Sequence, residues 1–244
     1  MKEITPSQLA AIIRGSRHIA ALTGAGISVE SGIPDFRSPG GLWERFDPME
    51  YATLQAFKAN PAKVWALINE MDALITRARP NPAHLALAAL EARGRLAGLI
   101  TQNVDNLHQA AGSKNVVEYH GNAHRFVCDT CRGQHPRETL DFEHIPLYCL
   151  CGGLIRPDVV FFGEPIPAAA QEAAYALVLT CDLLLIIGTS GEVAPANFLP
   201  QIAKSRGAVI VENNLVPTRL TRSLTDYFLP GKAGVVLPQV LQSL

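Results

Sequence analysis

Short apolar runs alternate along the chain with longer segments in which apolar residues recur at helical spacing. The apolar runs predict strands at residues 18–22, 96–100, 116–119, 158–162, 183–187, 208–212 and 226–229. The longer segments predict helices at residues 5–15, 50–58, 61–77, 82–94, 166–180, 195–206 and 234–243. Strands that alternate with helices in this way are typical of an α/β fold with a doubly wound parallel sheet.

Polar segments follow four of the predicted strands. They are Gly24 to Ser28, Gln102-Asn103-Val104-Asp105, Gly188-Thr189-Ser190 and Asn213-Asn214. Each segment alone is also explained by a turn or a helix cap. In an open α/β sheet, however, ligands bind beyond the carboxyl ends of the strands. If these strands are neighbours, all four segments line one crevice.

The first polar segment places two glycines, Gly24 and Gly26, one residue apart after a mostly apolar run. Because glycine has no side chain, backbone N–H groups there can approach a pyrophosphate. Val29 stands where the full dinucleotide fingerprint has its third glycine, so a tight turn without a ligand is an alternative interpretation.

The next segment, Gly32-Ile33-Pro34-Asp35-Phe36-Arg37-Ser38, presents an acid, an aromatic ring and a guanidinium in succession. Such a mixture on a loop bounded by glycine and proline suits a ligand better than a packing surface. Residues 39–49 are irregular, a pattern shared by flaps that order over a ligand and by ordinary long loops. His120, at the end of a predicted strand, is a candidate base because imidazole titrates near neutral pH.

Composition excludes several classes of protein. The chain has 244 residues, of which 48% are hydrophobic and 18% charged, as in a globular protein. Its net charge of −1 gives no electrostatic case for nucleic acid or an anionic membrane as the main partner. The N-terminal residues lack the apolar core of a signal peptide, and the run at 183–187 is too short to span a bilayer. We therefore expect a cytoplasmic location.

Four of the five cysteines lie close together in the sequence. They are Cys128, Cys131, Cys149 and Cys151. Four thiolates suit a tetrahedral Zn²⁺ ion with a structural role. The second pair has C-x-C spacing, which departs from the usual C-x-x-C, so His135 or His144 could replace one thiol. Cys181 is expected to be a small buried hydrophobe.

Several of these segments together resemble the sirtuins of prokaryotic type, which are NAD-dependent protein-lysine deacylases. The resemblance rests on GAGIS with GIPDFRS, on TQNVDNLH, on His120-Gly121 and on RPDVVFFGE at 156–164. It runs from about Leu22 to Asn214 and implies a single catalytic domain, residues 1–244, with a Rossmann-like core. In that arrangement the core comprises 1–34, 80–121 and 158–244, with a helical and flexible cofactor-loop insertion at 35–79 and a zinc-binding insertion at 122–157.

The resemblance also implies the residues of an NAD site. Those that would contact NAD are Gly24, Ala25, Gly26, Ser28, Asp35, Phe36, Arg37, Gln102, Asn103, Asp105, Gly188, Thr189, Ser190 and Asn214. His120 would be the catalytic base and Asn103 a second catalytic residue, whereas His84 and His108 are expected to be structural. For Asn214 the alignment is open by a residue or two.

An extended acetyl-lysine peptide is the substrate that the resemblance implies. The residues that would pair with it are Val160, Phe161, Phe162 and Gly163 on one side, with Val193 on the other. The carbonyl oxygen of the acyl-lysine would displace nicotinamide from NAD. His120 would then deprotonate a ribose hydroxyl, and water would release lysine and O-acyl-ADP-ribose.

The acyl preference depends on two positions that carry tyrosine and arginine in sirtuins that remove succinyl or malonyl groups. Here those positions align with Ile68 and Met71, which cannot hold a carboxylate. We therefore expect an apolar channel that accepts acetyl groups and, as an alternative, longer fatty chains.

Three other functions are alternatives to deacylation. Mono-ADP-ribosyl transfer would use the same NAD site. An NAD-sensing zinc scaffold without catalysis would be expected to lack His120 or Asn103, and both are present. A redox dehydrogenase would require the full glycine fingerprint and an acid about twenty residues beyond it.

Overall fold

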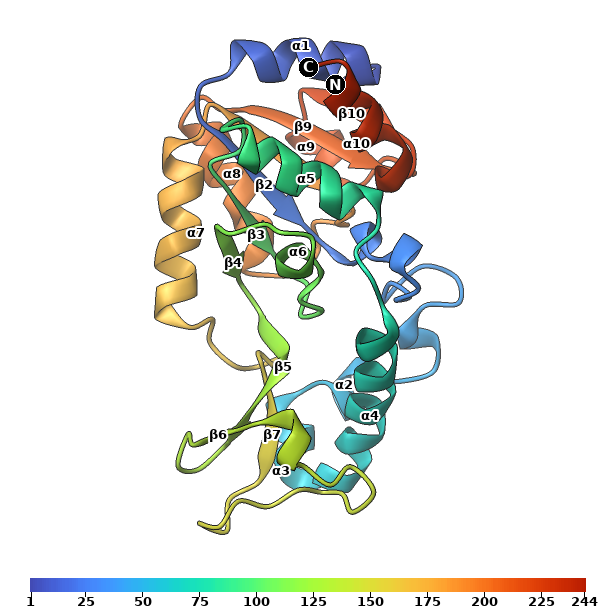
Figure 1. Cartoon of the computed structure of the whole chain (residues 1–244), viewed down its shortest axis with the longest axis vertical. Coiled ribbons are helices and arrows are strands. Elements are labelled where there is room, and N and C mark those ends of the chain that lie inside the picture. The colour runs from blue at the N-terminus through green and yellow to red at the C-terminus, as the bar shows by residue number, and fades with distance from the viewer.

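The computed structural model describes residues 1–244 and has two lobes stacked along its longest axis (Figure 1). The larger lobe contains a seven-stranded parallel sheet with the order β1-β10-β9-β8-β2-β3-β4. Its strands are β1 Lys2–Glu3, β2 Ile19–Thr23, β3 Gly98–Thr101, β4 Val116–Glu118, β8 Leu183–Ile187, β9 Val209–Asn214 and β10 Tyr227–Pro230. The predicted fold class, an α/β protein with a doubly wound parallel sheet, is confirmed.

Helices cover both faces of this sheet. The helices on one face are α1 Pro6–Gly15, α5 Pro82–Ala92 and α10 Ala233–Gln242, and those on the other are α7 Ala168–Thr180, α8 Leu199–Ser205 and α9 Arg219–Ser223. Adjacent residues of one strand enter opposite cores: Ala21 packs with the first group and Leu22 with the second. A strand that is buried on both faces needs a continuous apolar run, so the central strands can be predicted from the sequence.

The carboxyl ends of four central strands lie in register. Thr23 at the end of β2 pairs with Ile187 of β8 and Thr101 of β3, and Ile187 pairs with Asn213 of β9. The chain order of the strands reverses between β2 and β8, which is the position where open α/β sheets bind ligands. The expected adjacency of the four polar segments is therefore confirmed.

The smaller lobe combines a three-stranded sheet with three helices (Figure 1). Its elements are β5 Gly121–Cys128, β6 Gln134–His135, β7 Ile155–Val159, α2 Pro48–Tyr51, α3 Leu54–Ala59 and α4 Pro61–Arg77. Trp65 of α4 stacks on Phe126 of β5 with ring centroids 6.4 Å apart. These rings belong to a separate apolar cluster that holds the helices against the sheet.

Two predicted elements are wrong in their bounds. The strand expected at 158–162 is β7, Ile155–Val159, and it pairs antiparallel with β5 rather than joining the parallel sheet. The helix expected at 50–58 is two short helices, because Thr53 leaves the helical path to form a bridge with Phe162. A short helix, α6 Leu107–Ala110, follows the predicted ligand segment after β3. No helix combines the length and the apolar character that crossing a membrane requires.

Candidate functional site

The loops after β2 and β8 pack directly on each other through glycine. The N–H of Gly26 donates to the carbonyl oxygen of Gly188 at 2.8 Å, and the N–H of Gly24 donates to that of Ile187 at 3.1 Å. Gly188 has φ +62°, and a Cβ on it would lie 2.4 Å from the Ile27 nitrogen. These two glycine N–H groups are therefore used within the protein. Glycine is required here because the backbones of the two loops approach each other closely. The sequence alone did not indicate this role.

The segment after β3 ties the crevice together by side-chain hydrogen bonds. Asn103 Nδ2 donates to the carbonyl oxygen of Gly24 at 3.1 Å and to Ser28 Oγ at 3.0 Å. Gln102 Nε2 donates to Thr189 Oγ1 at 3.0 Å. Side chains from three strand ends thus form one connected polar surface. Ala25 and Ser190 lie half-buried on the same two loops.

His120 lies beside this surface. Its Nδ1 is 3.1 Å from the carbonyl oxygen of Gln102. Because a carbonyl can only accept, Nδ1 carries the proton and Nε2 has the free lone pair. Burial lowers the pKa of His120 below its ordinary value of 6.5, and the hydrogen bond to Gln102 opposes that shift. The imidazole is therefore neutral at pH 7 and can accept a proton at Nε2.

His84 and His108 lie behind the crevice rather than in it. Both are fully buried, and their ring centroids are 4.9 Å apart. Burial lowers the pKa of His84 to about 4 and that of His108 to about 3. His108 Nε2 is 3.0 Å from Thr23 Oγ1, at the end of β2. The pair is thus neutral and supports the strand end, which fits the structural role expected for it.

The loop that contains Asp35, Phe36 and Arg37 is held by its own side chains. Asp35 Oδ1 accepts from the N–H groups of Arg37 at 3.0 Å and of Ser38 at 2.7 Å. Phe36 packs on Trp43 with centroids 4.8 Å apart. Arg37 Nε lies 3.3 Å from Glu192 Oε2, on the loop after β8. The Arg37–Glu192 ion pair joins this loop to the crevice.

The end of β9 contributes two asparagines of different character. Asn213 is buried, and its Nδ2 donates to the carbonyl oxygens of Leu229 at 2.8 Å and Gly231 at 3.0 Å. Asn213 Oδ1 is buried without a partner. Asn214 is half-buried, and its Nδ2 donates to the carbonyl oxygen of Thr189 at 3.1 Å. Of the two, Asn214 therefore offers the more accessible side chain at the crevice.

The predicted peptide edge, residues 160–163, begins at His120. The N–H of Val160 donates to the carbonyl oxygen of His120 at 2.9 Å. Both backbone groups of Phe162 are also used, because its N–H donates to the carbonyl oxygen of Ala52 and its carbonyl oxygen accepts from the N–H of Leu54. The carbonyl of Val160 and both backbone groups of Gly163 form no backbone hydrogen bond. On the loop after β8, the carbonyl of Val193 accepts from the N–H of Asn197 at 3.0 Å. The free groups that a peptide could use are therefore few and closely spaced.

Arg156 holds this edge from the inside, a role that the sequence did not indicate. Its side chain is 4% exposed, and it donates to Glu164 Oε1 at 2.7 Å and Oε2 at 2.6 Å. It also lies 3.5 Å from Asp129 Oδ1, between the first two cysteines. A buried guanidinium needs such partners, but nothing in the local pattern of the sequence distinguishes it from a surface arginine.

The four clustered cysteines converge at the end of the smaller lobe. Cys128 Sγ is 3.5 Å from Cys151 Sγ, and Cys131 Sγ is 3.8 Å from Cys149 Sγ. All four sulfurs lie within 4.8 Å of one another, and neither His135 nor His144 belongs to the group. The backbone N–H of Cys131 contributes most to lowering the pKa of Cys128 to about 7. Cys181 is buried elsewhere, as expected.

Known proteins resemble the chain over almost its whole length. The model of the Sir2 family matches residues 24–195. "NAD-dependent protein deacylase 2" of Pyrobaculum aerophilum is 49% identical over 97% of this chain and 94% of its own. A Sir2 homologue solved in complex with NAD is 42% identical, covers 99% of this chain and 94% of its own, and has a TM-score of 0.92. A Sir2 variant solved with a deacetylated p53 peptide and 3′-O-acetyl-ADP-ribose is 33% identical, covers 98% of both chains and also has a TM-score of 0.92. The chain belongs to the Sir2 family.

Proposed function

We propose that this protein is an NAD-dependent protein-lysine deacetylase. It would transfer the acetyl group of acetyl-lysine to ADP-ribose and release nicotinamide and O-acetyl-ADP-ribose. The observation that carries the proposal is the position of His120. Its free Nε2 belongs to a half-buried neutral imidazole, and its own backbone carbonyl accepts from Val160 at the start of the predicted peptide edge. The base and the substrate edge are thus joined by one hydrogen bond.

The crevice residues fit a dinucleotide. Half-buried amide and hydroxyl side chains line neighbouring strand ends, at the position where the order of the strands reverses. Gln102, Asn103 and Asp105 would hold the nicotinamide half, and Thr189, Ser190 and Asn214 the adenosine half. Arg37 would contact a phosphate and Phe36 would cover the site. NAD, when bound, supplies the ribose carbon that accepts the acyl oxygen.

His120 and Asn103 would act on the bound substrates. His120 Nε2 accepts the proton of a ribose hydroxyl, a step that requires the neutral imidazole which burial favours. Asn103 orients the sugar through its amide, which its bonds to Gly24 and Ser28 hold in place. The free carbonyl of Val160 would accept from an amide N–H of the substrate, and Gly163 would pair with its backbone.

The thiol cluster fits a structural zinc ion. Sulfurs about 2.3 Å from a tetrahedral Zn²⁺ ion lie about 3.8 Å from one another. Two of the sulfur separations, 3.5 Å and 3.8 Å, are close to that value. The four cysteines would hold the ion, including both sulfurs of the C-x-C pair. It would fold the tip of the smaller lobe, at a distance from the base.

The apolar surroundings of Ile68 and Met71 support acetyl over acidic acyl groups. Ile68 is 8% exposed within the cluster that contains Phe57 and Phe161, and Met71 packs against a neighbouring apolar cluster. Neither of these two side chains is a cation that could pair with a succinyl carboxylate. Acetylated proteins are therefore the proposed substrates, and the cytoplasm remains the predicted location.

The decisive experiment follows NAD consumption with an acetyl-lysine peptide, comparing the native protein with His120→Ala. We expect nicotinamide, deacetylated peptide and O-acetyl-ADP-ribose from the native protein and almost none from the variant. Release of nicotinamide with ADP-ribosylated protein and no deacetylated peptide would replace the proposal by ADP-ribosyl transfer. Tight NAD binding without turnover would replace it by an NAD sensor.

A further inference from the structure

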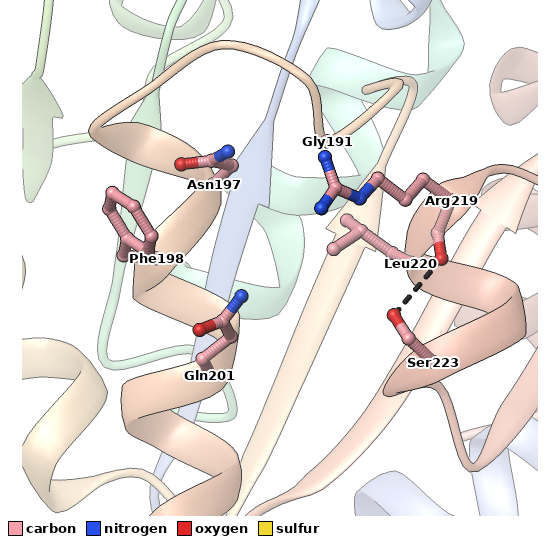
Figure 2. A pocket seen from close by; sticks show the side chains of 7 residues that line it. All are labelled: Gly191, Asn197, Phe198, Gln201, Arg219, Leu220 and Ser223. Carbon is pink, nitrogen blue, oxygen red and sulfur yellow. Dashed lines mark hydrogen bonds between the residues drawn. The ribbon is translucent and has the colours of Figure 1, made fainter.

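A hollow of about 370 Å³ lies between the start of α8 and the helix α9 (Figure 2). The residues that line it are Gly191, Asn197, Phe198, Gln201, Arg219, Leu220 and Ser223. None of these is among the residues predicted to bind NAD or peptide or to act on them. Its size falls within the range of small-molecule sites in proteins.

Polar side chains lie beside apolar ones in the lining, and only Arg219 is charged. Arg219 extends its guanidinium from α9 into the space between the two helices (Figure 2). It forms no salt bridge, and no carboxylate lines the hollow. Asn197 and Gln201 add side-chain amides to the lining. An unpaired cation thus extends into the hollow beside neutral polar groups.

The wall of the hollow depends on one glycine. Gly191 has φ +70°, and a Cβ on it would lie 2.4 Å from Leu220 Cγ. The loop after β8 therefore rests directly on Leu220, an approach that only glycine permits without displacement. Phe198, 50% exposed, adds an apolar surface at the opposite side. The hollow thus has a fixed wall, an apolar side and separate polar groups.

We infer that this hollow binds a carboxylate ligand. The carboxylate would pair with the Arg219 guanidinium, and the side-chain amides of Asn197 and Gln201 would hydrogen-bond to polar groups of the same ligand. Guanidinium and carboxylate form bidentate hydrogen bonds, which makes the carboxylate the best match for an unpaired arginine. Phe198 and Leu220 would contact the carbon body of the ligand.

Two kinds of molecule could supply the carboxylate that binds in the hollow. The first is the protein substrate, through an acidic residue. Gly191 precedes Val193 by two residues, and extended chain advances at most about 3.6 Å per residue. Val193, a proposed peptide contact, therefore lies close to the wall of the hollow, and an acidic side chain near the acyl-lysine would extend toward Arg219. This source rests on the proposed function. The second source is a free small carboxylate, and this source is independent of the proposed function.

Binding is tested by NMR titration of the native protein with two probes. N-acetyl-glutamate amide represents an acidic residue within a chain, and succinate represents a free carboxylate. We expect amide shifts centred on Gly191 and Asn197, with binding weakened about tenfold in Arg219→Gln. Arg222→Gln is the matched control, since Arg222 lies on the same helix but outside the lining. N-acetyl-glutamine amide should not bind.

Kinetics separates the two sources. Acetyl-lysine peptides that carry glutamate at successive flanking positions are compared with the same peptides carrying glutamine. A substrate source predicts that one glutamate lowers KM about tenfold, with kcat unchanged, and that Arg219→Gln alone removes the effect. If the ligand is instead a free small carboxylate, succinate should bind and the flanking residue should not change KM. If no probe binds in a manner that depends on Arg219, the inference is wrong. Turnover of the glutamine peptides reports separately on the deacetylase activity.

Discussion

The hydroxyl of Ser28 donates a 2.6 Å hydrogen bond to Asp105 Oδ2, and both residues are buried. Ser28 ends the glycine loop after β2, whereas Asp105 follows β3, so the bond joins two loops 77 residues apart in the chain. Ser28 Oγ also accepts from Asn103 Nδ2. One hydroxyl thus positions both an amide and a carboxylate of the crevice.

Replacing this hydroxyl should affect stability and activity together. Ser28→Ala leaves the buried Asp105 carboxylate without one donor, at a cost of about 1–3 kcal/mol in the free energy of unfolding. Because Asn103 loses an acceptor, we also expect kcat/KM for NAD to fall roughly tenfold. Urea denaturation and steady-state kinetics measure the two effects. Ser205→Ala, at an exposed position on α8, should change neither. Native stability and activity in Ser28→Ala would show that the bond does not position the site.

The pH dependence of turnover should reflect His120. Burial lowers its pKa below 6.5, so the neutral base is present at pH 7 and is lost only as pH falls through that lowered value. We expect the acid limb of kcat/KM to lie below pH 6.5 and the rate to be flat from there to neutrality. His124→Gln, on the adjacent strand, should leave the profile unchanged. An acid limb above pH 7 would contradict the assignment of His120.

The central sheet could be predicted because its strands are buried on both faces. Leu183 to Ile187 is a continuous apolar run that only such a position explains, and the polar residues after it mark the strand end. The small antiparallel sheet was not predicted in this way. Its strand β7 contains Arg156 and Asp158, and its pairing with β5 depends on tertiary contacts rather than on an apolar run.

Several features of the site could also not be predicted from the sequence. The glycines after β2 suggested backbone groups open to a phosphate, whereas the N–H groups of Gly24 and Gly26 bond to the end of β8 and to the residue that follows it. That contact exists only because β2 and β8 are neighbours. The burial of Arg156 and its pairing with Glu164 likewise depend on packing against Phe57 and Phe161, which no local pattern specifies.

Loss of one thiol should remove the metal and loosen the tip of the smaller lobe. Three remaining cysteines bind Zn²⁺ far more weakly than four, so Cys151→Ala should contain no zinc after dialysis. We expect faster proteolysis between residues 128 and 155 with the large sheet intact. Metal content by mass spectrometry and limited proteolysis measure this. Cys181→Ala should keep its zinc, since Cys181 lies outside the thiol group. Full zinc occupancy in Cys151→Ala would contradict the four-thiol site.

Glu164→Gln should destabilise the protein in a pH-dependent way. Burial alone would raise the pKa of Glu164, but the Arg156 guanidinium and the Phe161 N–H hold that pKa below its ordinary value of 4.5. The stabilisation is therefore complete above pH 4.5 and is lost as pH falls through the lowered folded-state pKa. At pH 7 we expect a loss of about 2–3 kcal/mol in the free energy of unfolding.

Urea denaturation of the native protein and Glu164→Gln across this pH range provides the test. The difference between them should shrink as the native carboxylate becomes protonated. Glu143→Gln, at an exposed position in the same lobe, serves as the control. A difference that stays constant down to pH 3 would show that the charge of Glu164 contributes nothing.

The Arg37–Glu192 ion pair should compete with NAD. The two side chains are 42% and 54% exposed, so the pair itself contributes at most about 1 kcal/mol to stability. Arg37 is the proposed phosphate contact, and it must leave Glu192 if the same guanidinium is to bind a phosphate. Glu192→Gln should therefore lower KM for NAD by about two- to fivefold, with the free energy of unfolding almost unchanged.

Salt distinguishes this competition from a local rearrangement. Because exposed charges are screened at high ionic strength, the advantage of Glu192→Gln over the native protein should fade as salt rises towards about 1 M. Glu172→Gln, on the exposed side of α7, should match the native protein throughout. If Glu192→Gln raises KM for NAD, then Glu192 helps to position Arg37 for the phosphate rather than holding it away. A lowered KM that persists at high salt would instead attribute the gain to packing of the loop after β8, independent of its charge.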